Sequence, residues 1–142
     1  MVKKILLVIT AQAESLKRVD FVAQLALASD AQIIALNVVD TSVAKHLKTA
    51  TGTSESETIV RLQEDGWHYL YDVEDTCKGL GAKIVLQQEE GFPESVIGNT
   101  AKRFKADLVV MAYSRAGGYT QTRSERFVTS VIERVDCPVL VV

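Results

Sequence analysis

Five short apolar segments, separated by stretches of helical periodicity, constrain the fold of this chain more than any other feature of its sequence. The segments are Ile5 to Ile9, Gln32 to Val39, Ala82 to Leu86, Asp107 to Met111, and Pro138 to Val142. Four of them are nearly uninterrupted runs of apolar residues rich in Val, Ile and Leu, a pattern typical of strands that are buried on both faces of a parallel sheet. The segments therefore predict a parallel β-sheet with helices on both of its faces.

The intervening stretches carry apolar residues at intervals of three and four, which is the period of an amphipathic helix. The helices are predicted from about Ser15 to Ala28, from Ile59 to Leu80, from Pro93 to about Lys105, and from about Ser124 to Val135. This regular alternation predicts a doubly wound open α/β sheet with right-handed crossovers. At 142 residues the chain has room for one hydrophobic core, so we expect a single domain over residues 1–142.

Two residues and one segment outside the strands lead to more specific expectations. Gly66 lies on the apolar face of the second helix, where Gly costs about 1 kcal/mol relative to Ala, and a close backbone approach would explain it. The last helix is expected to bury Ile132. The segment Thr41 to Glu57 is polar, rich in Ser and Thr, and longer than most connections, so it is expected to form a lid or a disordered surface loop that carries His46.

Composition and charge narrow the classes of function. The net charge is -2 without a run of Lys or Arg, which disfavours nucleic acid as a partner. No apolar run approaches the roughly 20 residues that a membrane-spanning helix needs, and the N-terminal run is too short for a secretory signal, so we expect a cytoplasmic protein with no membrane partner. Cys77 and Cys137 are isolated in sequence and are expected to be buried free thiols.

The loops beyond the carboxyl ends of the strands, where ligands of open α/β sheets bind, carry few signs of catalysis. TAQAES after the first strand lacks the glycine-rich turn of a dinucleotide or P-loop site. His46 and His68 do not follow a strand, and no nucleophile stands near a base. Glu89 and Glu90 after the third strand are an acid pair or, more simply, a solvated turn. The His, Cys, Asp and Glu residues do not recur at the intervals typical of metal ligands, so we expect no metal. Together these observations predict a non-catalytic protein.

Several segments nevertheless match one family over essentially the entire chain. The matching segments are KKILLVIT, ALNVVD, GFPESVI, ADLVVMA and SVIERVDCPVLVV. Together they resemble the universal stress protein family, and the closing CPVLVV is one of its most recognisable segments. The resemblance implies a five-stranded parallel sheet with strand order 3-2-1-4-5.

ATP-binding members of that family carry a glycine-rich loop after the fourth strand, where this chain has MAYSRAGGYTQTRSERF. By the resemblance, the three glycine positions fall on Ala112, Arg115 and Glu125, and the hydroxyl position falls on Arg126. The family's acidic residue at the end of the first strand corresponds to Thr10. The resemblance thus marks the following tentative nucleotide site, in which only Val38 and Met111 keep the family's apolar contacts: Thr10, Val38, Met111, Ala112, Arg115 and Arg126.

These replacements lead to two alternatives for the ligand. Side chains at the glycine positions obstruct a phosphate cradle, and the capping-box pattern Thr122-x-x-Glu125 predicts that Glu125 competes for the donors of the helix N-terminus. On this basis we expect no cofactor and no ATP binding in the usual manner. The alternative is that Arg115, Arg123 and Arg126 hold ATP or a cyclic nucleotide in place of the glycine motif.

The last strand suggests a second kind of function, assembly. In the order 3-2-1-4-5 it is an edge strand, and PVLVV is apolar with no Lys to discourage pairing. Members of the family commonly pair this strand with its twin, which implies a homodimer through Val139, Leu140 and Val141. Together, these considerations predict a dimeric, non-catalytic stress-response or regulatory protein with an unknown regulatory protein partner.

Overall fold

The computed structural model describes residues 1–9, 18–113 and 117–142 and contains one parallel sheet. The strands are β1 (Lys4–Ile9), β2 (Gln32–Asp40), β3 (Lys83–Gly91), β4 (Leu108–Met111) and β5 (Val139–Val141). They pair in the order β3-β2-β1-β4-β5, which confirms the predicted open sheet and its strand order. Thr10 and Arg115 lie outside the described residues.

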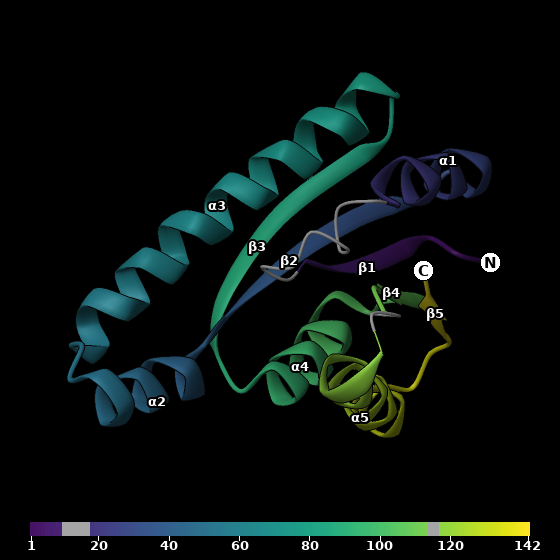
Figure 1. The fold of residues 1–142 in the computed structure, drawn as a ribbon. Coiled ribbons are helices and arrows are strands. Elements are labelled where there is room, and N and C mark those ends of the chain that lie inside the picture. Colours follow the sequence, from purple (N-terminus) through teal and green to yellow (C-terminus); the bar gives the residue numbers. More distant parts are fainter. Residues whose placement is uncertain (10–17, 114–116) are drawn as a thin grey trace.

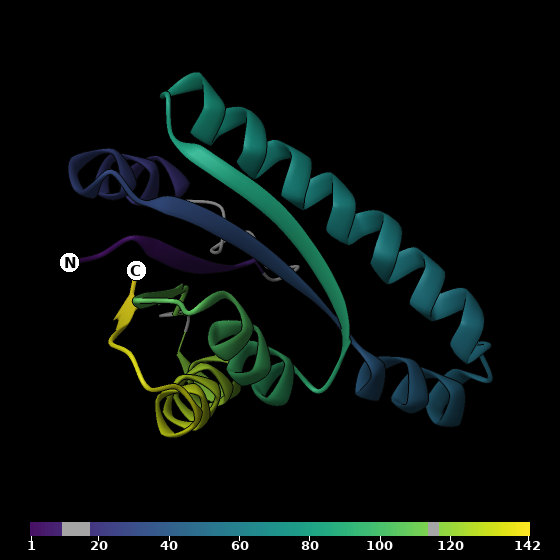
Figure 2. The same ribbon diagram turned by 180° about the vertical axis from the view of Figure 1, so that it is seen from behind.

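Helices cover both faces of the sheet, as Figures 1 and 2 show from opposite sides. The helices are α1 (Val19–Ser29), α2 (Thr41–Thr51), α3 (Glu55–Gly79), α4 (Pro93–Phe104) and α5 (Gly118–Arg134). Residues of α1 and α3 pack in the core on one face of the sheet, and residues of α4 and α5 pack in the core on the other. Helix α2 follows β2 directly and lies beyond the carboxyl end of that strand (Figure 1).

The central strand β1 supplies both cores, because successive side chains of a strand point to opposite faces. Ile5 and Leu7 join the core beneath α1 and α3, whereas Leu6 and Val8 join the core beneath α4 and α5. These four side chains are at most 3% exposed. Burial on both faces explains why the segment is apolar at every position.

The expectation of a lid or disordered loop over Thr41 to Glu57 is wrong, because the segment forms α2 and the first turn of α3. The side chain of Asp40 accepts a hydrogen bond from the Ser42 backbone N–H at 3.0 Å and so caps α2. Gly52 ends that helix with a φ of 74°. Ser54 then caps α3 by accepting from the Glu57 N–H at 3.5 Å. The capping signals were present in the sequence, but the helix has too narrow an apolar stripe to show the helical period.

The third strand is longer than predicted, and this corrects the view of Glu89 and Glu90 as a turn. Strand β3 continues to Gly91, which pairs with Asp40 of β2. Glu89 accepts a hydrogen bond from Arg103 at 2.9 Å, and the Glu90 carboxylate accepts from the Gln63 side chain. The second half of β3, residues 87–91, is polar, as an edge strand allows. It therefore lacks the apolar run from which the first half of the strand was predicted.

The expectation that the last helix buries Ile132 is also wrong. Val131 is fully buried, but Ile132 is 53% exposed, because the next residue of a helix points about 100° further around its axis. Helix α5 buries a narrower stripe: Phe127 and Val128 are partly buried one turn before Val131, and Val135 is partly buried just after the helix ends.

Gly66 allows α3 to approach the sheet closely, as predicted, but the approaching groups are side chains rather than backbone. A Cβ at this position would lie 2.6 Å from Gln88 Nε2 and would overlap Asn37 Oδ1. Asn37 donates to the Ile9 carbonyl at 3.2 Å, while Gln88 donates to Asn37 Oδ1 at 3.3 Å and to the Gln63 carbonyl at 3.0 Å. This amide cluster of Asn37, Gln63 and Gln88 joins α3 to the carboxyl end of β1.

The two cysteines are free, in agreement with the prediction, although they differ in burial. Cys77 is buried and Cys137 is half-buried. Burial raises the pKa of the Cys77 thiol to about 11 and also raises the pKa of Cys137. Both side chains are therefore neutral thiols near pH 7.

Within the described ranges, none of the helices has the length and apolar character needed to cross a membrane.

Candidate functional site

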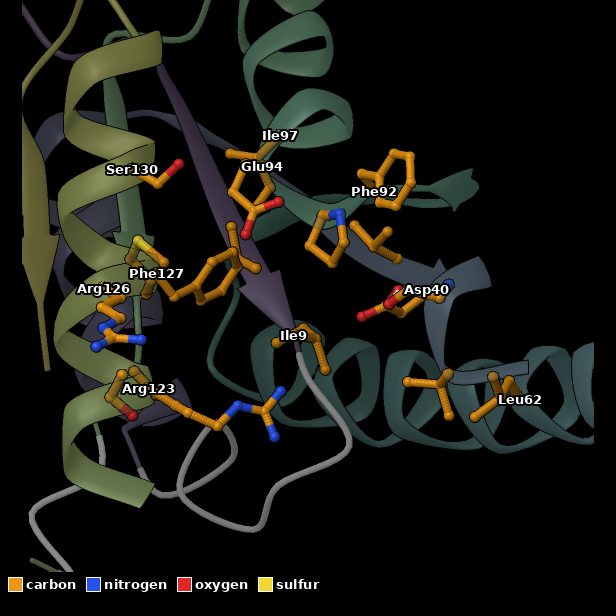
Figure 3. A pocket seen from close by; sticks show the side chains of 18 of the residues that line it. Ile9, Asp40, Leu62, Phe92, Glu94, Ile97, Arg123, Arg126, Phe127 and Ser130 are labelled. Atoms are coloured by element: carbon orange, nitrogen blue, oxygen red, sulfur yellow. Dashed lines mark hydrogen bonds between the residues drawn. The ribbon is translucent and has the colours of Figure 1, made fainter. Parts of the chain in front are cut away.

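A pocket of about 840 Å³ lies where β1, β2 and β4 end (Figure 3). The carboxyl ends of parallel strands meet at one edge of the sheet, which is where open α/β sheets bind ligands. The floor of the pocket is apolar and is formed by Ile9, Val38, Ile97, Met111 and Phe127. Such a floor suits a flat or apolar part of a small molecule.

Charged side chains stand around this apolar floor. Asp40 comes from the end of β2, and Glu94 comes from the first turn of α4. Arg123 and Arg126 come from α5; in Figure 3 the side chain of Arg123 extends from the helix toward the side of Asp40, whereas that of Arg126 lies close to α5. Elements that are distant in sequence thus bring two carboxylates and two guanidinium groups to one cavity.

Most of the site residues expected from the sequence line this pocket together. Val38, Met111, Ala112 and Arg126 are all pocket residues. The two other expected residues, Thr10 and Arg115, fall in segments that the structure does not describe. Arg123 was expected from the sequence only as a possible anion ligand, and the structure also places it in the pocket.

The predicted capping box at Thr122 and Glu125 is wrong, because α5 begins at Gly118 and both residues lie inside it. Thr122 Oγ1 donates back to the Gly118 carbonyl at 3.1 Å, and Glu125 accepts from the Tyr113 hydroxyl at 2.9 Å. The N-cap residue, Gly117, has no side chain with which to cover the N–H groups of the first turn. Glu125 is therefore not the expected competitor for an anion at this helix N-terminus.

Several pocket residues were missed by sequence reasoning. Asp40 and Glu94 closely follow strand ends, and their position after the strands was the available signal. Tyr119 and Phe92 are large side chains at the pocket, 75% and 57% exposed respectively. The guanidinium carbon of Arg123 lies 5.8 Å from the centre of the Tyr119 ring, within cation–π range. Both rings offer a surface for stacking at the mouth of the pocket.

The chemistry of these residues suits binding of an anion better than binding of a metal. Guanidinium groups and helix N–H groups donate hydrogen bonds to phosphate or carboxylate oxygens. Among the described residues, no group of three or more His, Cys, Asp or Glu side chains is placed to hold a metal ion. The pocket can therefore hold an anionic group against α5 and an uncharged part against its floor.

Comparison with known proteins agrees with this architecture. Residues 1–142 match the universal stress protein family. Universal stress protein MJ0531 of Methanocaldococcus jannaschii is 32% identical over 140 residues, which cover 99% of this chain and 81% of that protein. The solved structure of the hypothetical protein MJ0577 has a TM-score of 0.80 at 21% identity and covers 100% of this chain and 96% of that one.

A second solved structure, a universal stress protein in complex with cAMP, has a TM-score of 0.71 at 21% identity, with 99% of this chain and 96% of that chain covered. At these identities the two structures support the fold alone. An open parallel sheet with a pocket at the carboxyl ends of its strands defines a doubly wound α/β domain. The match along the whole sequence makes the assignment specific: this chain belongs to the universal stress protein family.

Proposed function

We propose that this protein binds a nucleotide in the pocket and acts as a non-catalytic regulatory protein of the stress response. The observation that carries the proposal is the meeting of Arg123, Arg126 and the first turns of α5 with an apolar floor. Arginine side chains can hold a phosphate without the glycine-rich cradle, because the guanidinium group presents several donors in one plane. The floor then accommodates the base.

Two further observations support a nucleotide as the ligand. Glu125 is engaged by Tyr113, so its carboxylate does not occupy the donors of the α5 N-terminus. A universal stress protein of similar fold was solved in complex with cAMP. Regulation then follows if ligand binding changes the surface that a regulatory protein partner contacts, without any chemical step on the ligand.

Calorimetric titration with AMP, cAMP and ATP tests the proposal. We expect binding by the native protein, and the Arg123→Gln/Arg126→Gln double variant should bind at least about tenfold more weakly, because two charge-assisted hydrogen-bonding groups are lost. Arg61→Gln, an exposed arginine of α3 outside the pocket, is the matched control and should bind normally. Absence of heat at millimolar AMP, cAMP and ATP would overturn nucleotide binding. Bound nucleotide should also be recovered unchanged by chromatography, whereas hydrolysis would contradict a non-catalytic role.

The edge strand β5 favours a second proposed property, a homodimer. Val139, Leu140 and Val141 are only partly buried, and the adjoining recess is lined by Leu140 and Val141 together with Phe21, which is 46% exposed. We propose that two copies pair their β5 strands antiparallel and cover these side chains. Light scattering should give twice the chain mass of 15.6 kDa. Leu140→Lys should shift it to the monomer, because Lys on an edge strand opposes pairing, and a monomeric native protein would refute the dimer.

A further inference from the structure

Four charged side chains of the pocket, those of Asp40, Glu94, Arg123 and Arg126, have no ionic partner among the described residues. The ion pairs among the described residues lie outside the pocket. They join Lys48 to Glu55, Lys78 to Glu74, Lys83 to Asp30, and Arg103 to Glu89. The four pocket groups take part in none of them, although all four line one cavity. Neither arginine has closed onto a carboxylate across the pocket, so a ligand finds both signs of charge available.

The charges of these four groups cancel. Two carboxylates and two guanidinium groups give a sum of zero among the described lining residues. A nucleoside triphosphate carries about four negative charges, more than two arginines can balance, and the carboxylates of Asp40 and Glu94 in the same cavity repel the excess. A nucleotide with one phosphate carries about one or two charges, which the arginines can balance without crowding the carboxylates.

The carboxylates also indicate what the uncharged end of the ligand must offer. An ionised carboxylate only accepts hydrogen bonds. Asp40 Oδ1 already accepts from the Ser42 N–H and from the Ser42 hydroxyl at 2.6 Å, which holds the side chain in a fixed orientation at the pocket wall. Groups that lie against this wall must therefore be donors, such as the hydroxyls of a ribose or the amino group of a base.

We infer that Asp40 and Glu94 make the pocket selective for nucleotides with a single phosphate, open or cyclic, over nucleoside triphosphates. This inference rests on the proposed nucleotide binding and adds which nucleotide is chosen and which residues choose it. Arg123 and Arg126 attract the phosphate, and Asp40 and Glu94 limit the negative charge that the pocket accepts. Selectivity thus comes from repulsion of the wrong ligand as well as from attraction of the right one.

The test compares AMP, cAMP and ATP by calorimetry, with and without Mg²⁺, for the native protein and for Asp40→Asn, Glu94→Gln and the double variant. Asn is as good an N-cap as Asp, so Asp40→Asn keeps the start of α2, and Glu94→Gln keeps the side-chain size. We expect the native protein to bind AMP and cAMP at least about tenfold more tightly than ATP, and the double variant to gain about tenfold for ATP with a smaller change for AMP.

The control is Glu133→Gln, which removes the same charge from an exposed position of α5 outside the pocket and should leave the three affinities unchanged. If the native protein binds ATP as tightly as AMP, or if the variants change all three affinities equally, the selectivity inference is overturned while nucleotide binding stands. If no nucleotide binds to the native protein, nucleotide binding itself fails, and the inference fails with it. A thermal melt of each variant confirms that it is folded before the titrations are compared.

Discussion

The amide cluster beneath α3 and the charged groups of the pocket each include one residue of β2, Asn37 and Asp40, yet they are built in opposite ways. Asn37 is 5% exposed, and its amide both donates and accepts within the fold. Asp40, three positions along, lines an open cavity without an ionic partner among the described residues. Polar groups that satisfy one another stabilise the fold, whereas charges left facing a cavity are available to a ligand.

The largest expected effect is on the amide cluster, through Gly66→Ala. The added methyl group would overlap the side chains of Asn37 and Gln88, and we expect the free energy of unfolding to fall by about 3 kcal/mol, as is typical of overpacking in a tight contact. Gly79→Ala is the control, because a methyl group added there would meet no atom within 4 Å, and it should be neutral or slightly stabilising. Chemical denaturation measures both. Equal effects of the two substitutions would show that Gly66 is not held in close contact.

Removal of the central amide should have the next largest effect. Asn37→Leu removes the side-chain donor to the Ile9 carbonyl and one of the two acceptors of the Gln88 amide, so we expect a loss of about 2 kcal/mol of unfolding free energy. The Asn37→Leu/Gln88→Leu double variant should lose less than the sum of the two single variants, because both ends of one hydrogen bond are then apolar. Strict additivity in this cycle would mean that the two amides are not coupled.

A smaller change in the free energy of unfolding, of opposite sign, is expected at Thr58. This residue tests the converse case, a buried polar group that lacks a partner. Its hydroxyl is buried without a hydrogen-bond partner in the described structure, and the residue is 1% exposed. Thr58→Val keeps the shape of the side chain and removes this group, so we expect stabilisation by about 1 kcal/mol. The midpoint of urea unfolding reports it. A fall in stability would indicate that the hydroxyl is hydrogen-bonded in solution.

The smallest effect concerns Asp107, a surface carboxylate outside the pocket that accepts hydrogen bonds from two backbone N–H groups. Hydrogen bonds from the backbone N–H groups of Lys3 and Lys4, at 2.8 and 3.0 Å, lower the pKa of Asp107. A lowered pKa in the folded chain gives stability that is fully present above the ordinary Asp pKa of about 3.9 and is lost as the pH falls through the folded value.

Asp107→Asn should therefore make stability less dependent on pH below about pH 4. Asp75→Asn, at an exposed position of α3, is the control and should leave the acid limb of the stability curve unchanged. Thermal melts between acidic and neutral pH give the comparison. An acid limb of Asp107→Asn that coincides with that of the native protein would contradict a role for these hydrogen bonds.

Sequence patterns predicted the elements that bury a broad and regular apolar face. They failed for elements that bury only a few residues. The sheet and the long helix α3 were predicted because runs such as Ile5 to Ile9 and the period of α3 record burial directly. Helix α2 was missed because it fully buries only Ala44. The start of α5 was misplaced because Thr122 and Glu125 resemble a capping box, although their side chains bond to Gly118 and Tyr113 instead.

The sequence by itself determined the class of fold, because apolar periodicity is a local record of which faces are covered. The family was indicated separately, by the resemblance of segments such as SVIERVDCPVLVV. It also named Val38, Met111, Ala112 and Arg126, which the structure brings to one pocket. Only the tertiary structure decided that Asp40 and Glu94 share one cavity with Arg123 and Arg126, and that Gly66 makes room for two amides. These juxtapositions join residues far apart in the chain, and through-space distance leaves no local pattern in a single sequence.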